Sequence, residues 1–365
     1  QFITRSLRPS ADLNALMIDN LGTMAGGGDT YPFGYSNAYS WGHSQVMNAA
    51  TWYFGDPVYR YLLELARTGP FSGQRMTDLS YPIHRYMAVD PDSVPPLPDG
   101  EYPRLQAFPV EQGVYDDVQA SEQQPLDVAL EDTFHKMTFR EGFAPDDSYL
   151  IVDGFSAGTH GHQDGNAILN YTANGRLFLI DRDYMENTPE HHSGLVIVKD
   201  GEQQKKPPLA RLDWAAADVG GADLSRSVVP NYNGTDWQRS IVSPNGDFYL
   251  IYDDISIKEA GDYVLKNMWQ TLGTPNVRGD RFEAEQQGVT MTIQSLDASD
   301  LRTQDRYGYF RKYWKSEYPY PYAEQATALS EVLEEKRYEA GERIGFVNVL
   351  SSRKAGDPEG GARQI

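Results

Sequence analysis

The sequence predicts an α+β protein in which a short helical segment precedes a large antiparallel β-sandwich. Apolar residues recur at helical spacing through roughly the first 68 residues, whereas from Phe134 onward they alternate with polar residues at a period of two. More than ten such strands follow one another without intervening helices. Asn174-Gly175 and Asn245-Gly246 are typical of tight hairpin turns. A run of strands of this length favours a sandwich.

The helical part is expected to contain two or three antiparallel helices. The first is predicted to begin at a Ser10–Asp12 cap and to end at the three glycines 26–28. A second covers residues 37–54, and a third begins after Asp56 with Pro57 in its first turn. So few helices cannot make a closed helical domain.

Four regions are expected along the chain: a helical segment at 1–68, a proline-rich connector at 69–130, a β-sandwich with a metal site at 131–352, and a tail at 353–365. Seven prolines between Pro82 and Pro109 interrupt any long element of the connector. Residues 323–340 are interpreted as one late helix or a polar connection. The predicted strands lie within 134–141, 148–155, 165–172, 176–183, 194–201, 239–246, 247–257, 262–272, 281–287, 289–296 and 345–352.

Composition excludes several classes of function. The net charge of −20 leaves no basic footprint for nucleic acid. No run of eighteen apolar residues is present, so a membrane span is not expected. The absence of cysteine rules out disulfides, thiolate zinc sites and cysteine nucleophiles.

Four of the seven histidines, His160, His162, His191 and His192, lie between residues 156 and 201. Asp181 ends the strand that the Asn174-Gly175 turn folds back, and His192 opens the next one. Three neighbouring strands are therefore predicted to bring His162, Asp181 and His192 together. Imidazoles with one carboxylate are typical ligands of zinc or a similar divalent ion.

Alternatives remain open within this set. His191 could take the place of His192, and Asp164 is either a fourth ligand or part of a turn with Gly165. The whole set could also be surface or capping residues. His160 is left over from the ligands, so it is a candidate acid or base, or a hydrogen-bond donor beside the metal.

A second constellation lies in the helical part. Tyr35 and Tyr39 share one helical face at a spacing of four, and Asn37 and His43 stand close by. A tyrosine acts as acid or base where a cation or hydrogen-bond donor stabilises its phenolate. Otherwise such tyrosines belong to a core.

Three segments together resemble the heparinase II/III-like group of polysaccharide lyases: THGHQDGNAI, LFLIDRDY and EHHSGLVIVKDG. The resemblance implies the last helices of an α/α toroid packed against a multi-layered β-sandwich, with substrate in the cleft between them. It also implies β-elimination of a uronate-containing polysaccharide. Such a lyase neutralises the C5 carboxylate, removes the C5 proton and protonates the departing O4.

The resemblance assigns roles residue by residue. His162, Asp181 and His192 take the zinc-ligand positions, and zinc holds the strands and orients His160, the catalytic histidine. Tyr39 is the catalytic tyrosine, with Tyr35 in reserve. The expected substrate-side residues are Asn37, His43, Tyr184 and Arg182. Further cations for a polyuronate are sought in Arg140, Lys199 and the Lys205-Lys206 pair.

The expected partner is an anionic polysaccharide, with neither nucleic acid nor membrane involved. The chain is expected to form a homo-oligomer or to associate with a missing N-terminal helical part. The resemblance also implies a secreted or periplasmic protein. Two other functions compete with the lyase: a non-catalytic carbohydrate-binding β-sandwich with a structural zinc and, ranked third, a zinc-dependent hydrolase.

Overall fold

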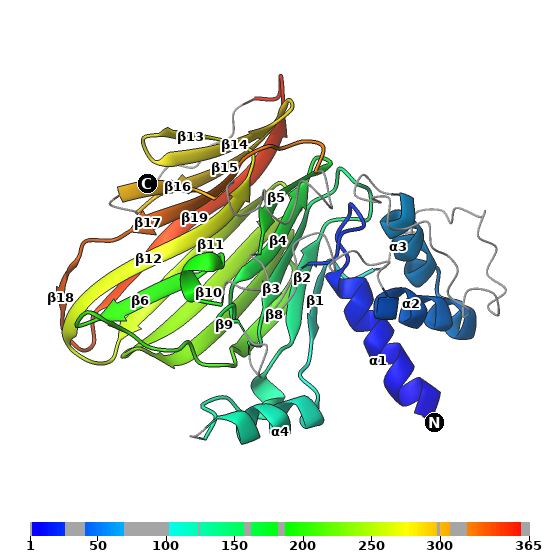
Figure 1. Ribbon diagram of the computed structural model, residues 1–365, viewed down its shortest axis with the longest axis horizontal. Helices are drawn as coiled ribbons and strands as arrows, with labels where there is room; N and C mark the ends of the chain where they lie inside the picture. Colours follow the sequence, from blue (N-terminus) through cyan, green and yellow to red (C-terminus); the bar gives the residue numbers. More distant parts are fainter. Residues whose placement is uncertain are drawn as a thin grey trace.

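The computed structural model describes residues 2–25, 41–68, 102–122, 125–156, 162–181, 187–297, 300–306 and 320–358. Figure 1 shows an α+β fold in which a group of helices stands beside two large antiparallel sheets. The predicted fold class is confirmed.

The helical unit contains α1 (Phe2–Met17), α2 (Trp41–Phe54) and α3 (Pro57–Thr68). The second and third helices were predicted, and the backbone amide of Val58 donates to the capping Asp56 carboxylate at 3.1 Å. The predicted Ser10–Asp12 cap is wrong, because α1 begins at Phe2 and runs through this region. The helix also ends well before the three glycines. Asp19 ends it there by accepting the amides of Leu21 and Thr23 in a tight turn.

The first sheet has eleven strands and the second has eight. The first runs in the order β1 (Leu105–Phe108), β2 (Lys136–Arg140), β3 (Tyr149–Asp153), β4 (Ile168–Ala173), β5 (Arg176–Ile180), β12 (Gly261–Leu272), β17 (Ala326–Val332) and β16 (Asp300–Asp305). It is completed by β6 (Leu195–Lys199), β7 (Glu202–Gln203) and β18 (Lys336–Tyr338). The second runs β13 (Thr274–Arg278), β14 (Arg281–Gln286), β15 (Val289–Ser295), β19 (Arg343–Lys354), β11 (Phe248–Ile257), β10 (Thr235–Pro244), β9 (Ala222–Tyr232) and β8 (Arg211–Val219).

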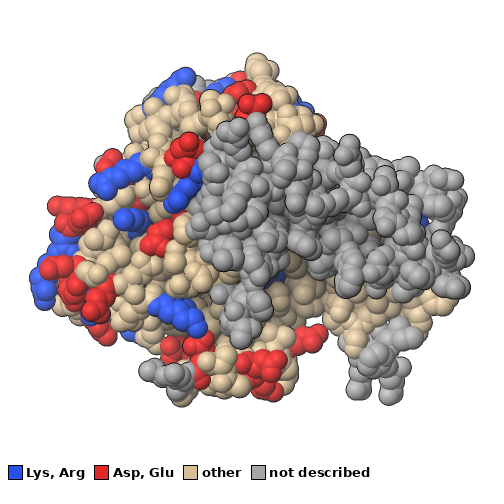
Figure 2. Space-filling model, in the orientation of Figure 1, with Lys and Arg blue, Asp and Glu red and all other residues tan. Residues whose placement is uncertain are grey.

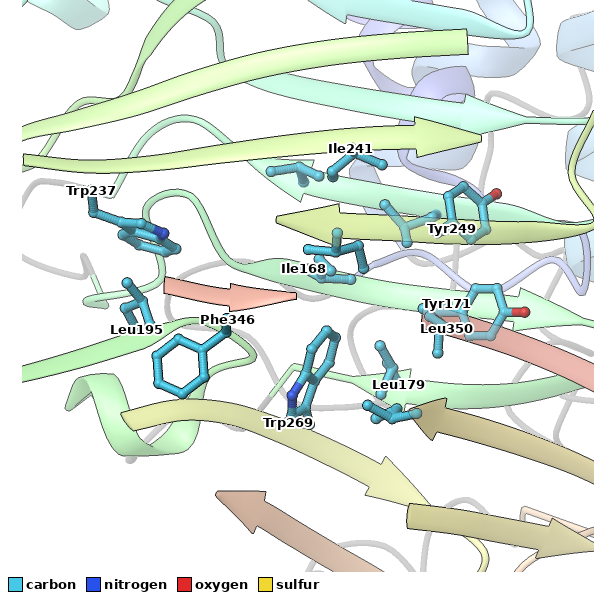
Figure 3. Close-up of a cluster of buried hydrophobic side chains, with 14 of the residues drawn as sticks. Ile168, Tyr171, Leu179, Leu195, Trp237, Ile241, Tyr249, Trp269, Phe346 and Leu350 are labelled. Carbon is cyan, nitrogen blue, oxygen red and sulfur yellow. The ribbon is translucent and has the colours of Figure 1, made fainter. Parts of the chain in front are cut away.

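The main hydrophobic core lies between the two sheets. Figure 3 shows side chains from both sheets meeting there. The labelled residues of the eleven-stranded sheet and its edge are Ile168, Tyr171, Leu179, Leu195 and Trp269, and those of the other sheet are Trp237, Ile241, Tyr249, Phe346 and Leu350. Burial of this many large apolar side chains is the main source of stability of the sandwich.

The helical unit covers the other face of β3 and β4. Leu16 and Ala25 pack against Tyr149, Ile151 and Leu169. Strand β3 is therefore buried on both faces, which explains its uninterrupted apolar run where a half-exposed strand would alternate.

A buried arginine fastens the helical unit to the sheet. The guanidinium of Arg140 donates to the Asn20 side chain and to the backbone carbonyl of Ile18, both just beyond α1. The Asn170 side chain of β4 donates to Asp19 at 3.2 Å. Arg140 is thus a structural residue and not the substrate-binding cation considered from the sequence.

One prediction about local structure is wrong. Residues 323–340 are neither a helix nor a polar connection, because they form β17 and β18 against β12. Buried Ala326, Ala328 and Leu329 pack into the sheet, and this tertiary contact overrides the helical preference of alanine and glutamate. The described part of the 69–130 connector contains β1 and a helix, α4 (Gln112–Ser121). Among the described residues, 3₁₀ turns also lie at Leu130–Asp132 and Pro189–His191.

The described surface carries charges of both signs. On the face shown in Figure 2, acidic and basic side chains are interspersed over the sandwich and are not gathered by sign. Among the helices of the described ranges, none has the length and apolar character that a membrane crossing requires.

Burial of Glu331 should make the stability of the folded protein depend on pH. Its Oε2 accepts the side chains of Asn267 from its own sheet at 3.0 Å and Asn348 from the opposite sheet at 2.9 Å, and burial raises its pKa from 4.5 to about 7. The folded state holds this proton more tightly than the unfolded state, so stability should fall as pH rises from about 4.5 to about 7. Glu331→Gln should remove up to about 3 kcal/mol of that dependence, measured by urea unfolding across this range. An unchanged slope in the variant would refute this assignment.

Candidate metal centre

The predicted ligands lie where three chain segments meet beside β4. His162 and Asp164 belong to the loop between β3 and β4, Asp181 directly follows β5, and His192 precedes β6. Two backbone hydrogen bonds fix these segments: the amide of Asp181 donates to the carbonyl of Leu169 at 2.7 Å, and that of Ile168 to Ser193 at 2.9 Å. The first residues of β4 therefore set the spacing between the Asp181 and His192 segments.

The hairpin that delivers Asp181 is the one predicted from the sequence. Asn174 and Gly175 both have positive φ, of 52° and 70°, as a two-residue hairpin turn of this kind requires. Ala173 pairs with Arg176 across the turn, so β5 returns along β4.

Four side chains form a buried cluster here. His162, Asp164, Asp181 and His192 are each at most 4% exposed. Potential ligand atoms of Asp164, Asp181 and His192 all lie within 4.8 Å of one another. The ring of His162 is adjacent, with its centroid 5.6 Å from that of His192. Two imidazoles and two carboxylates at this spacing could hold a divalent cation.

The pair formed by Asp181 and His192 fits such a cation. His192 Nδ1 donates to Asp181 Oδ1 at 2.8 Å, which leaves His192 Nε2 and Asp181 Oδ2 as buried atoms with no hydrogen-bond partner in the described structure. Burial raises the pKa of Asp181, partly offset by His192. Burial also acts to lower the pKa of His192, but the Asp181 carboxylate outweighs it and the pKa is raised. A cation at His192 Nε2 would satisfy that buried nitrogen and leave Asp181 to hold the ring through Nδ1, whereas a cation in place of the proton between Nδ1 and Oδ1 would bind both residues.

The geometry favours His192 over its neighbour. His191 lies in the 3₁₀ turn before it, and its ring forms a 3.1 Å hydrogen bond with the Thr188 hydroxyl. Asp164 lies within the cluster, as the four-ligand alternative requires, and the chain turns immediately after it through Gly165 and Asn166.

A buried lysine lies next to the cluster. Lys206 is 2% exposed, and its Nζ donates to the carbonyl of Gly165 at 3.3 Å and lies 5.1 Å from the ring centroid of Trp237. Burial lowers its pKa from 10.5 to about 7, although Asp164 and Asp181 counteract this effect. From the sequence, Lys206 and its neighbour Lys205 were considered as surface cations that could bind the substrate. The contacts of Lys206 were missed because they come from a distant loop, at Gly165, and from the eight-stranded sheet, at Trp237.

A functional residue that the sequence analysis did not identify is Arg239. It lies on β10 of the other sheet, is fully buried, and forms a two-pronged pair with Asp253, Nε to Oδ1 at 2.7 Å and the terminal nitrogen to Oδ2 at 2.9 Å. Its other nitrogen donates to the carbonyls of Asn166 at 2.8 Å and Ser193 at 3.2 Å. Each carbonyl lies within two residues of a cluster member. The sequence feature that could have identified it is the position of Arg239 between Trp237 and Ile241, where strand alternation places all three side chains on the inward face.

Several predicted site residues lie outside the described ranges. His43 is placed in α2, but its side chain is not described. The others are Tyr35, Asn37, Tyr39, His160, Arg182 and Tyr184, and their roles remain predictions.

The chain shares its fold with two solved polysaccharide lyases. A crystal structure of heparinase III superposes with a TM-score of 0.63 at 10% identity, over 97% of this chain and 49% of that one. Heparan sulfate lyase HepC from Pedobacter heparinus superposes with a TM-score of 0.58 at 16% identity, over 94% and 46%. The chain thus spans about half the length of these proteins. No family model and no curated protein matches the sequence. The predicted resemblance is confirmed at the level of the fold.

Arg239 can be tested directly. Arg239→Lys keeps the charge but cannot make both prongs to Asp253 and both carbonyl contacts, so we expect a loss of about 3 kcal/mol in the free energy of unfolding. Urea unfolding measures it, with Arg302→Lys as control because Arg302 is an exposed member of a surface pair. Equal stability of the two variants would contradict this role.

Proposed function

We propose that the chain carries the β-sandwich and adjoining helices of a polysaccharide lyase that cleaves a uronate-containing polymer by β-elimination. The observation that carries the proposal is the shared fold with two such lyases over nearly the whole chain, with a buried His–Asp cluster among the residues that resemble them. Fold alone does not determine chemistry, so the cluster is the necessary second support.

We propose that the cluster binds zinc through His162, Asp181 and His192, with Asp164 as a fourth ligand. The close approach of ligand atoms from Asp164, Asp181 and His192, and the 2.8 Å separation of His192 Nδ1 from Asp181 Oδ1, support this assignment. Bound zinc would supply a cross-link between three chain segments, and the enclosed site suits a structural ion. Arg239 would hold the two loops that carry Asp164 and His192.

The acid–base chemistry is assigned to His160 and Tyr39, with Tyr35 in reserve. One removes the C5 proton and the other protonates the departing O4. The C5 proton is weakly acidic, so the substrate carboxylate must be neutralised as charge develops on it. We assign that neutralisation to Asn37 and His43, with Arg182 and Tyr184 on the substrate side. His160 is two residues from His162, so the loop that the cluster anchors also carries the catalytic histidine.

The proposal is tested by the ultraviolet absorbance of the unsaturated uronate product. The protein, folded and loaded with zinc, is incubated with alginate, glucuronan, heparan sulfate, chondroitin sulfate and hyaluronan. Absorbance should rise with one polymer. The rate of this rise should be at least 100-fold lower in His160→Ala, because general acid–base catalysis contributes about that factor.

His191→Ala is the matched control, since His191 lies outside the cluster and should keep wild-type activity. A polymer that binds without any rise in absorbance would contradict the lyase and support a carbohydrate-binding module. Hydrolysis without a new double bond would instead support the metal-dependent hydrolase.

A further inference from the structure

The outer face of the eight-stranded sheet carries a row of four side chains on four adjacent strands. Trp214 of β8 pairs with Arg226 of β9, Arg226 with Ser240 of β10, and Ser240 with Tyr252 of β11. Residues next to them in sequence, such as Arg239, point into the sandwich, so the row points outward. Trp214 and Tyr252, at its two ends, are 38% and 39% exposed.

Arg226, within this row, has no anionic partner among the residues that the structure describes. Its guanidinium carbon lies 5.3 Å from the centroid of the Trp214 ring, and within the described ranges no carboxylate pairs with it. Its Nε is buried and has no hydrogen-bond partner within the described ranges, so an external anion would meet the terminal nitrogens of the guanidinium. The arginines nearby on the same sheet differ, since Arg211 pairs with Asp213 and Arg343 with Asp254. An arginine without a carboxylate in a chain of net charge −20 indicates that the row can accept an external anion.

The dimensions and chemistry of the row fit a sugar chain. Three strand spacings separate Trp214 from Tyr252, about 14 Å, which is the span of a short oligosaccharide. Aromatic side chains offer flat apolar faces with polar edges, as pyranose rings do, and a guanidinium forms paired hydrogen bonds with a carboxylate or sulfate. The Tyr252 hydroxyl donates to Asp254, whose charge Arg343 balances, so this end of the row does not repel an anion.

We propose that Trp214, Arg226 and Tyr252 of this row form a second binding site for an anionic polysaccharide, separate from the cleavage site. The choice of an anionic polymer as ligand rests on the proposed function. The row lies on the face of β10 opposite to Arg239, and Arg239 contacts the loops that carry Asp164 and His192. The site would hold a long polymer against the protein and leave the handling of short substrates unchanged.

The test is affinity electrophoresis at 4 °C in gels that contain one of the five polymers named above or neutral dextran. Trp214→Ala, Arg226→Gln and Tyr252→Ala should each weaken binding of one anionic polymer about tenfold, equivalent to about 1.4 kcal/mol. Added salt should weaken wild-type binding more than that of Arg226→Gln. Matched controls are Phe248→Ala, an exposed aromatic outside the row, and Arg302→Gln on the other sheet.

Two further measurements distinguish the row from the cleavage site and from a self-association surface. Cleavage of a tetrasaccharide should be unchanged in the row variants, provided that circular dichroism shows them folded. Row-dependent binding without cleavage would refute the lyase but leave this site standing. The inference is overturned if wild type binds no polymer, or if the row variants bind like the controls.

The apolar side chains of Leu224, Val242 and Leu250 flank the row, so the row could instead be a self-association surface. Sedimentation of wild type and Trp214→Ala tests this. A dimer that Trp214→Ala dissociates, with polymer binding intact, would make this a self-association face and overturn the inference.

Discussion

The interaction on which the candidate site most depends is the buried pair of Arg239 and Asp253. A buried guanidinium is tolerated only when its charge and its donors are satisfied, and here one carboxylate and two backbone carbonyls do so. The carbonyls belong to loops from the opposite sheet. The pair therefore joins the sheets and fixes the segments that carry Asp164 and His192, as a metal centre made of separate loops requires.

Strand β4 connects this centre to the helical unit. The carbonyl of Leu169 accepts the amide of Asp181, and the next residue, Asn170, donates to Asp19 beyond α1. Two consecutive residues of one strand thus hold the cluster on one side and the helices on the other. In the proposed lyase, such a strand would keep helical tyrosines and sandwich histidines in register, since acid–base catalysis depends on fixed geometry.

Features determined by local sequence could be predicted. The Asn174-Gly175 hairpin, the alternating strands, and the convergence of His162, Asp181 and His192 follow from turn chemistry and a period of two, and each segment predicted as a strand overlaps one. Features determined by tertiary contacts could not. Strands β8 and β9 were missed, and β17 was taken for a helix or connection because its alanines become strand residues only against β12. Arg239 is buried against loops of the opposite sheet, and Lys206 contacts Gly165 of one loop and Trp237 of β10. A single strand pattern contains none of these contacts.

The proposed metal centre of His162, Asp164, Asp181 and His192 can be observed directly. The most direct test is a crystal structure of protein dialysed against zinc, with anomalous diffraction measured on both sides of the zinc absorption edge. One strong peak per chain is expected, within about 2.2 Å of a ring nitrogen of His192 and of a carboxylate oxygen of Asp181 or Asp164. A cluster without a peak, or a zinc bound elsewhere, would contradict the proposed metal centre.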